Sequence, residues 1–254
     1  MPTTPQLPEG APVWIELCTT DVDVAVPFYT ALFGWEHEGS EPEAGGYGTF
    51  TKGGRRIAGS TPVQSPDQAA AWSVYLQTSD AGAAAARATS AGATVVVEPT
   101  DVADLGRYAW LTDPGGAQVG LWQPGTHHGS ELVVEHGAPA WYELMATDYP
   151  AALDFYASAA LWDVHTMSNT AEFRYSTLGE GESARAGIMD ASGFLPDGVP
   201  SFWVVYLGAD DPDAAAKRVE ELGGQVVEPP ADTPFGRLAT VADPLGTQFK
   251  IIGV

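Results

Sequence analysis

The stretch "PVWIELCTTDVDVAVPFYTALFGWE" (12–36) returns in the second half of the chain as "PAWYELMATDYPAALDFYASAALWD" (139–163). Two later stretches return as well. "WSVYLQTSD" (72–80) matches "WVVYLGADD" (203–211), and "LGRYAWLTDPGGAQVGLW" (105–122) matches "FGRLATVADPLGTQFKII" (235–252). Self-similarity over a whole half of a chain is the mark of a duplicated domain. The sequence therefore predicts two copies of one fold.

The boundary between the copies is a segment without clear periodicity. Residues 126–137 are rich in turn-forming residues, which favour a linker. We expect a first domain over residues 11–125 and a second over 138–254, joined by the linker 126–137.

A weaker repeat lies inside each copy. Asp21 ends an alternating run and precedes a helical stretch that closes at Gly34, and Asp80 and Gly92 bracket another helical stretch in the same way. Asp is a good N-cap, and Gly commonly follows a helix C-terminus. Short strand-like pieces such as "ATVVVEP" and "AQVGLW" follow the helix. The repeating unit is one strand, one helix and about three strands, used four times, which is an α+β arrangement.

Charge and composition exclude several classes of function. The chain of 254 residues has 33 acidic and 11 basic residues, a formal charge of −22. Such a surface repels phosphate backbones and anionic membranes, so we expect no nucleic acid and no membrane partner. The single Cys18 rules out a disulfide within the chain. The first residues lack the pattern of a signal peptide, and no apolar run has the length of a membrane helix, so we expect a cytoplasmic protein.

Four segments resemble the vicinal-oxygen-chelate superfamily, the glyoxalase/bleomycin-resistance/dioxygenase group. They are "TTDVDVAVPFYTALFGWE", "TDYPAALDFYASAALWD", "LTDPGGAQVGLWQP" and "VADPLGTQFKII". The resemblance implies an α+β fold of four βαβββ modules. These form two glyoxalase-like domains with curled mixed sheets that enclose cavities. It also implies a fused pair of domains in place of a dimer, and hence a monomer.

The resemblance further implies where a divalent metal would be held. The ligand positions fall at Trp14 and Trp141, at Ser73 and Val204, and at Gly120 and Lys250. None of these is a usual metal ligand, and a lysine repels a cation. The five histidines are not spaced to share an ion, and we expect them to be exposed. We therefore expect neither a metal nor another cofactor.

Strand alternation sorts the side chains that line the expected cavity. Val13, Ile15 and Leu17 form an apolar face for the helix, which turns Trp14 and Glu16 to the other side. By the same parity the expected ligand-binding residues are Trp14, Trp141, Tyr75, Tyr206, Gln118, Gln248 and Lys250. Aromatic walls with a few polar groups are typical of small-molecule sites.

Glu16 and Glu143 are the candidate catalytic residues. Burial disfavours a charged carboxylate, so each glutamate needs a partner or a chemical role. The open alternatives are a structural pair with Lys250, Arg107, Arg237 or a tyrosine hydroxyl, recognition of a ligand, and general acid/base catalysis.

These residues favour one function and leave others open. The leading hypothesis is metal-free binding of a small organic molecule, aromatic or partly cationic, such as a drug or secondary metabolite. The alternative is a metal-independent enzyme, such as an isomerase, a hydroxylase or an accessory factor in secondary metabolism, that uses a cavity glutamate as acid or base. A metal-dependent glyoxalase or dioxygenase, and a scaffold that binds another protein, are the remaining alternatives.

Overall fold

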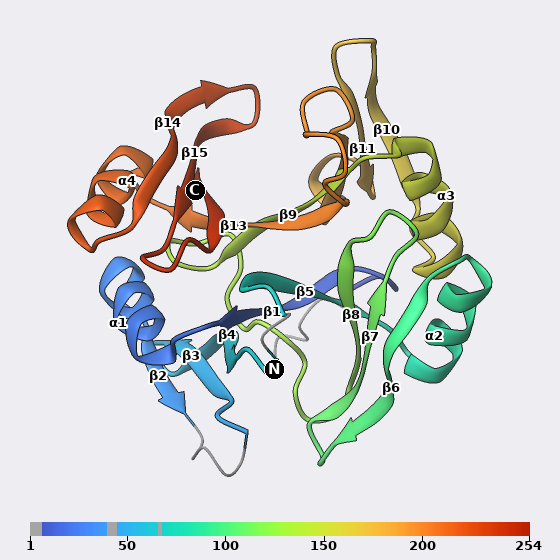
Figure 1. Cartoon of the computed structure of the whole chain (residues 1–254), viewed down its shortest axis with the longest axis horizontal. Coiled ribbons are helices and arrows are strands. Elements are labelled where there is room, and N and C mark those ends of the chain that lie inside the picture. Colours follow the sequence, from blue (N-terminus) through green and yellow to red (C-terminus); the bar gives the residue numbers. More distant parts are fainter. Residues whose placement is uncertain (1–6, 40–44, 66–67) are drawn as a thin grey trace. The chain divides into compact units, whose positions relative to one another are not determined.

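The computed structural model describes residues 7–39, 45–65 and 68–254. The expectation that the chain starts without a signal peptide concerns in part residues 1–6, which lie outside the described residues. The chain folds into four modules, each with one helix and four strands, as the repeat predicts (Figure 1).

The first half of the chain contains modules 1 and 2. Module 1 consists of β1 (Pro12–Thr19), α1 (Val22–Phe33), β2 (Glu36–Gly39), β3 (Gly48–Lys52) and β4 (Arg55–Pro62). Module 2 consists of β5 (Ala71–Gln77), α2 (Ala81–Ser90), β6 (Thr94–Val102), β7 (Gly106–Thr112) and β8 (Gln118–Pro124).

The second half contains modules 3 and 4. Module 3 consists of β9 (Pro139–Ala146), α3 (Tyr149–Ala159), β10 (Val164–Asn169), β11 (Arg174–Leu178) and β12 (Ala186–Asp190). Module 4 consists of β13 (Phe202–Ala209), α4 (Pro212–Glu221), β14 (Gln225–Thr233), β15 (Gly236–Ala242) and β16 (Gln248–Gly253).

Each half of the chain forms one mixed sheet. The strand order is β2-β3-β4-β1-β5-β8-β7-β6 in the first sheet and β10-β11-β12-β9-β13-β16-β15-β14 in the second. The first strand of a module pairs in parallel with its fourth, and the remaining pairs within the module are antiparallel. The predicted fold class is confirmed: the chain is an α+β protein with two glyoxalase-like domains, whose sheets are not closed into barrels.

The helices begin and end where the sequence indicates. Asp21 is the N-cap of α1 and accepts hydrogen bonds from two backbone N–H groups of the first turn. Asp211 caps α4 in the same way, and Asp80 and Asp148 cap α2 and α3 by accepting one such bond each. Gly34 ends α1 with a φ of 68°, the left-handed conformation that glycine adopts without strain.

The helices pack across the two halves of the chain. α2 packs on α3, and α1 packs on α4 (Figure 1). As a result the molecule divides into two compact units. Unit 1 contains described residues 7–13, 74–128 and 142–203, and unit 2 contains 14–39, 45–65, 68–73, 129–141 and 204–254. Each unit thus joins modules from both halves, and the domain boundaries expected from the sequence stay a prediction.

A buried hydrogen-bonded group lies at the centre of unit 2. The Tyr29 hydroxyl donates to Oδ2 of Asp243 at 3.1 Å and accepts from the Trp72 indole at 3.0 Å. Unit 1 contains the same group, because Tyr156 donates to Asp113 at 3.0 Å and accepts from Trp203 at 3.1 Å. Burial, and then the neighbouring carboxylate, raise the pKa of both tyrosines well above the usual range.

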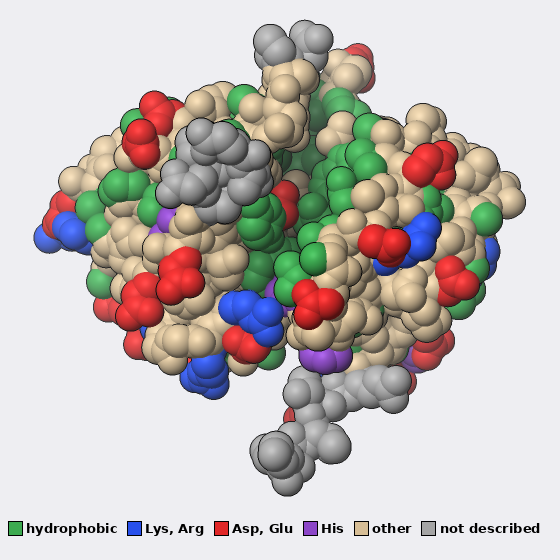
Figure 2. Space-filling model, turned by 90° about the horizontal axis from the view of Figure 1, so that it is seen from below, with side chains coloured by type: hydrophobic (Ala, Val, Ile, Leu, Met, Phe, Trp, Pro, Cys, Tyr) green, Lys and Arg blue, Asp and Glu red, His purple; other side chains and the backbone are tan. Residues whose placement is uncertain are grey.

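Acidic side chains are scattered over the face of the molecule shown in Figure 2, with few basic side chains between them. Among the helices of the described residues, none combines the length and the apolar composition that a bilayer-spanning helix needs.

Candidate functional site

Trp14 and Glu16 lie on β1 and share a partner that the sequence did not indicate. Trp14 is 4% exposed, and its indole donates to the Tyr47 hydroxyl at 3.2 Å. Tyr47, just before β3, makes a side-chain hydrogen bond to Glu16. Burial, and then the Glu16 charge, raise the pKa of Tyr47, so its hydroxyl stays protonated and donates to the carboxylate. Of the alternatives for Glu16, the tyrosine hydroxyl is therefore a partner.

The close approach of Tyr47 explains a glycine in β4. Gly59 is the register partner of Glu16, and a Cβ built on Gly59 would overlap the Tyr47 hydroxyl. The phenol therefore lies directly over the backbone beside Glu16. The Tyr47 residue is 38% exposed, so this group of Trp14, Glu16, Tyr47 and Gly59, named here the β1 cluster, reaches the surface of unit 2.

Module 3 repeats part of the β1 cluster. Gly187 is the register partner of Glu143, and a Cβ on Gly187 would overlap the Tyr175 hydroxyl. Glu143 is 5% exposed, so it is buried more deeply than Glu16, whereas Trp141 on the same strand is only half-buried. The two copies of the Trp-x-Glu pattern thus differ, with the carboxylate more accessible in the first.

The Tyr75 side chain covers Gly120, a position that the resemblance assigns to a metal ligand in module 2. Tyr75 and Gly120 are register partners of β5 and β8, and the Tyr75 ring fills the space that any side chain at Gly120 would occupy. The ring also contacts Trp110 with centroids 5.3 Å apart. The Trp110 indole in turn donates to Oε1 of the exposed Gln118 at 3.3 Å.

The equivalent position in module 4 is Lys250, and it too is engaged by a tyrosine. The Lys250 ammonium donates to the Tyr206 hydroxyl at 3.0 Å and lies 5.0 Å from the centre of its ring. Gln248 lies two residues earlier on the same strand and is exposed. Arg107 and Arg237, the other cations considered for the glutamates, pair with aspartates, namely Asp101 for Arg107 and Asp213 and Asp232 for Arg237.

The residues at the family's ligand positions do not fit a divalent metal. The Tyr75 ring covers Gly120, Lys250 adds a positive charge, and the Trp14 indole is a donor without a lone pair for a cation. Within residues 7–39, 45–65 and 68–254, no three His, Cys, Asp or Glu side chains converge to hold an ion.

Cys18 and the histidines add no nucleophile or ligand group to the β1 cluster. Burial, and then the Glu16 charge, raise the pKa of Cys18 to about 11, which keeps the thiol protonated. His37 contacts Ser60 at 2.8 Å, and burial lowers its pKa. The expectation of exposed histidines holds for His128 but is wrong for the others: His37, His136 and His165 are half-buried, and His127 is buried against Trp122.

Tyr47, Tyr175 and Trp110 are the residues that sequence reasoning missed. The two tyrosines occupy matching places in "GYGTF" (46–50) and "RYSTL" (174–178), a similarity too short to find without the structure. Trp110 was within reach, because it is the register partner of Gly120 and alternation places the two on one face.

Comparisons with known proteins identify the family of the chain. The family described as "Glyoxalase/Bleomycin resistance protein/Dioxygenase superfamily" matches residues 11–121 and 138–251. The chain is 36% identical to "Putative glyoxylase CFP32" of Mycobacterium tuberculosis, over 99% of this chain and 98% of that protein. It is 37% identical to "Anthracycline biosynthesis protein DnrV" of Streptomyces peucetius, over 96% of this chain and 93% of that protein.

A solved structure shares the fold at low sequence identity. The Mn(II)-bound glyoxalase from Novosphingobium aromaticivorans matches with a TM-score of 0.69 at 16% identity, over 96% of this chain and 82% of that chain. Two family matches that together span most of the chain, and relatives similar over almost its whole length, show that this chain belongs to the Glyoxalase/Bleomycin resistance protein/Dioxygenase superfamily.

Proposed function

We propose that this protein binds a small, flat organic cation at the β1 cluster without a metal ion. The observation that carries the proposal is the half-buried Glu16 carboxylate, which the Tyr47 hydroxyl holds beside the buried Trp14 indole. An oriented carboxylate next to aromatic side chains suits a ligand that is both aromatic and cationic. Since Trp14 is almost fully buried, the ring surface offered to the ligand is that of Tyr47.

Trp141, Glu143, Tyr75, Tyr206, Gln118, Gln248 and Lys250 stay predicted ligand-binding residues of the other modules. Tyr75 and Tyr206 contact Gly120 and Lys250, so these two rings fill space next to the family's metal-ligand positions. The family resemblance and the fused domains support a monomer that sequesters a drug or secondary metabolite. The relative named for anthracycline biosynthesis suggests a probe, because an anthracycline is flat, aromatic and carries an amino sugar.

The test is a titration of the protein with an anthracycline, followed by tryptophan fluorescence. Saturable quenching is expected, and Glu16→Gln should weaken binding by about tenfold, since it removes the counter-charge but keeps the shape. Glu220→Gln, at an exposed position of α4, is the matched control and should bind like the wild type. Unchanged affinity of Glu16→Gln would remove this carboxylate from the site.

A metal-independent enzyme is the second candidate. The observation that favours it is the hydrogen bond between two acid–base groups, the Glu16 carboxylate and the Tyr47 hydroxyl. The name "Putative glyoxylase" of one relative supports a search for turnover. If Glu16 is a general acid or base, Glu16→Gln abolishes turnover while folding and ligand affinity persist. Ligand binding without turnover would leave the binding function alone.

A further inference from the structure

Two arginines at matching positions of the repeat have different partners. In module 4 the Nε and Nη2 groups of Arg237 donate to the two carboxylate oxygens of Asp213, the latter at 2.7 Å. Its Nη1 group donates to Asp232 at 3.0 Å. Arg237 is thus held by a two-pronged carboxylate contact of the kind that guanidinium groups form best.

Arg107 in module 2 lacks the first of these carboxylates. Its Nη1 lies 3.4 Å from Asp101, and its Nη2 donates to the Pro99 carbonyl at 2.8 Å. Its Nε is buried and has no hydrogen-bond partner among the residues that the structure describes. An unsatisfied buried donor costs free energy, so this edge of the guanidinium favours an acceptor.

The difference traces to one residue in the first turn of the helix. Asp80 and Asp211 are the N-caps of α2 and α4. The residue two positions after the N-cap is Gly82 in module 2 and Asp213 in module 4. Gly82 has no carboxylate to offer Arg107. Module 4 therefore shows that a carboxylate is the group that pairs with this arginine, and module 2 does not supply one at this position.

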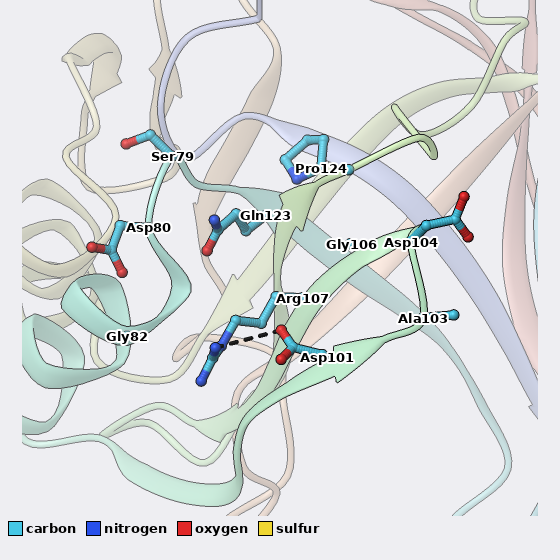
Figure 3. A pocket seen from close by; sticks show the side chains of 11 residues that line it. Ser79, Asp80, Gly82, Asp101, Ala103, Asp104, Gly106, Arg107, Gln123 and Pro124 are labelled. Carbon is cyan, nitrogen blue, oxygen red and sulfur yellow. Dashed lines mark hydrogen bonds and ion pairs between the residues drawn. The ribbon is translucent and has the colours of Figure 1, made fainter.

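A cavity opens at this place in module 2. It has a volume of about 550 Å³, within the range of small-molecule sites. Figure 3 shows Asp80 and Gly82 of α2 on one side and Asp101, Arg107 and Gln123 of the sheet on the other. All of its lining residues lie in unit 1, and none belongs to the β1 cluster.

The charges around the cavity select the kind of ligand. Asp80, Asp101 and Asp104 are among the lining residues, against one guanidinium; Asp101 pairs with Arg107, whereas the Asp104 carboxylate points away from it (Figure 3). A phosphate or a dicarboxylate would meet this excess negative charge, whereas a molecule with one carboxylate and one ammonium group would satisfy both signs. In module 4 one arginine, Arg237, forms ion pairs with two aspartates, Asp213 and Asp232.

We propose that the cavity beside Gly82 binds a small zwitterion, a molecule with a carboxylate at one end and an ammonium group at the other. The carboxylate pairs with the Arg107 guanidinium from the side of Gly82, the side from which the Asp213 side chain contacts Arg237. The ammonium group lies beside Asp80 and Asp101. This site is separate in residues and in ligand chemistry from the proposed function.

The test uses a substitution that copies module 4. A Cβ built on Gly82 meets only Asp80 Oδ1, at 3.4 Å, so a side chain fits there without displacing backbone. Gly82→Asp supplies the missing carboxylate from within the chain and should close the site. Gly82→Ala is the matched control, because it adds a side chain without a charge and should leave the site open.

Binding is measured by NMR titration of the full chain at low salt with γ-aminobutyrate and ε-aminocaproate, with butyrate and butylamine as single-charge controls. Saturable binding of a zwitterion is expected in wild type and Gly82→Ala. Affinity should fall at least tenfold in Gly82→Asp and in Arg107→Gln. Asp213→Gly, which frees Arg237, should create a second site, and this result does not depend on how Gly82→Asp folds.

Three results would overturn the proposal. The first is that neither zwitterion binds the wild type saturably. The second is that folded Gly82→Asp, checked by its thermal unfolding, binds like Gly82→Ala. The third is that butyrate binds as well as γ-aminobutyrate, which would show that the aspartates do not recognise the ammonium group.

Discussion

The hydroxyl of Tyr29, in the first half of the chain, donates a hydrogen bond to the carboxylate of Asp243, 214 residues later, and the two groups are 3.1 Å apart. Tyr156 and Asp113 form the same bond at 3.0 Å. These four residues come from the two motifs that carry the family resemblance, the Phe-Tyr pair of the first helix and the Asp-Pro turn before the last strand. The motifs therefore join modules across the duplication within each compact unit.

Loss of the Tyr29 hydroxyl should destabilise the fold. Tyr29→Phe leaves the Trp72 indole and Asp243 each with one partner fewer in a buried place, which costs about 1–3 kcal/mol. Tyr156→Phe should have a similar effect because its surroundings are equivalent. The measurement is urea unfolding, with Tyr108→Phe, at a half-exposed position, as the control. Equal midpoints for Tyr29→Phe and Tyr108→Phe would contradict the role of the buried bond.

The contact between Tyr47 and Gly59 predicts a specific rescue. Gly59→Ala forces its methyl group against the Tyr47 hydroxyl and should cost about 1–3 kcal/mol of overpacking. Adding Tyr47→Phe removes the clashing oxygen, so the double variant should lose less stability than the two single variants together. Gly193→Ala is the control, since a Cβ there meets nothing within 4 Å. Strict additivity at Gly59 and Tyr47 would show that they do not touch.

The raised pKa of Cys18 predicts that its thiol reacts slowly with alkylating reagents and that the rate depends on pH. The pKa is about 11 in the folded protein against the ordinary value of 9.0, because of burial first and the Glu16 charge second. The folded chain therefore holds this proton more tightly than the unfolded chain. The resulting stability is complete below pH 9.0 and is lost as the pH rises through 9.0 towards 11.

Iodoacetamide alkylation across this pH range measures the effect, with urea-unfolded protein as the reference. Glu16→Gln should lower the pKa of Cys18, because it removes the second cause of the shift. A native alkylation rate equal to that of the unfolded chain at pH 8 would contradict the burial of the thiol.

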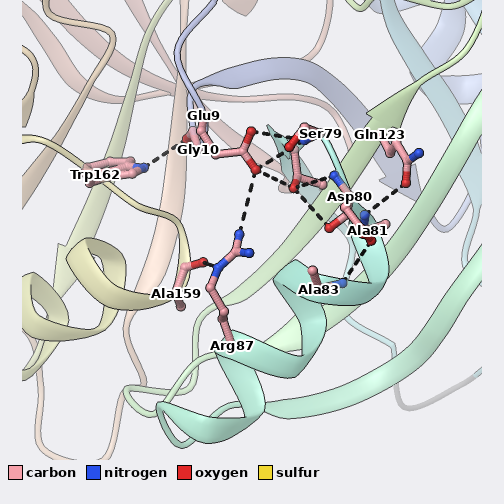
Figure 4. Close-up of polar contacts among 11 residues, drawn as sticks. Glu9, Gly10, Ser79, Asp80, Ala81, Ala83, Arg87, Gln123, Ala159 and Trp162 are labelled. Atoms are coloured by element: carbon pink, nitrogen blue, oxygen red, sulfur yellow. Dashed lines mark hydrogen bonds and ion pairs between the residues drawn. The ribbon is translucent and has the colours of Figure 1, made fainter.

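Glu9 ties the first described residues of the chain to unit 1. Its carboxylate accepts from the Thr78 hydroxyl at 2.6 Å and from the Ser79 N–H at 3.0 Å, and it lies 3.7 Å from Arg87 (Figure 4). Arg87 also donates to the Ala159 carbonyl at the end of α3. Glu9→Ala should therefore destabilise the protein by about 1–3 kcal/mol through the lost charge-assisted hydrogen bonds.

Salt distinguishes the parts of this effect. The ion pair with Arg87 is partly exposed and should weaken at high ionic strength, whereas the bonds to Thr78 and Ser79 should persist. Glu9→Gln keeps an acceptor and should lose less stability than Glu9→Ala. If both variants unfold like the wild type in urea, Glu9 contributes nothing to unit 1.

Sequence reasoning reached the fold because its signals are local or periodic. Asp21 and Asp80 cap their helices, and the duplicated Trp-x-Glu pattern lies on the first strand of modules 1 and 3, as alternation and repetition predict. The packing of α1 on α4 could not be predicted from the sequence, because an apolar helix face shows that a helix is packed but not which element it packs against.

The candidate site was predictable only in part. Glu16 was found because it repeats, but Tyr47 was missed because it lies 31 residues after Glu16 in the chain, beyond α1 and β2. Gly120 and Lys250 were recognised as poor metal ligands, yet only the structure shows the tyrosine that each one contacts. The repeat shows that Gly82 is equivalent to Asp213. Only the structure shows that this difference removes a carboxylate partner from Arg107 that Arg237 has.

The central claim is that the β1 cluster binds its ligand without a metal. The most direct measurement is the metal content of the untagged protein, made together with an anthracycline titration before and after treatment with a chelator. The prediction is far less than one equivalent of metal per chain, and an affinity that chelation does not change and Glu16→Gln reduces. One equivalent of tightly bound zinc, nickel, manganese or iron, with binding lost on chelation, would contradict the claim.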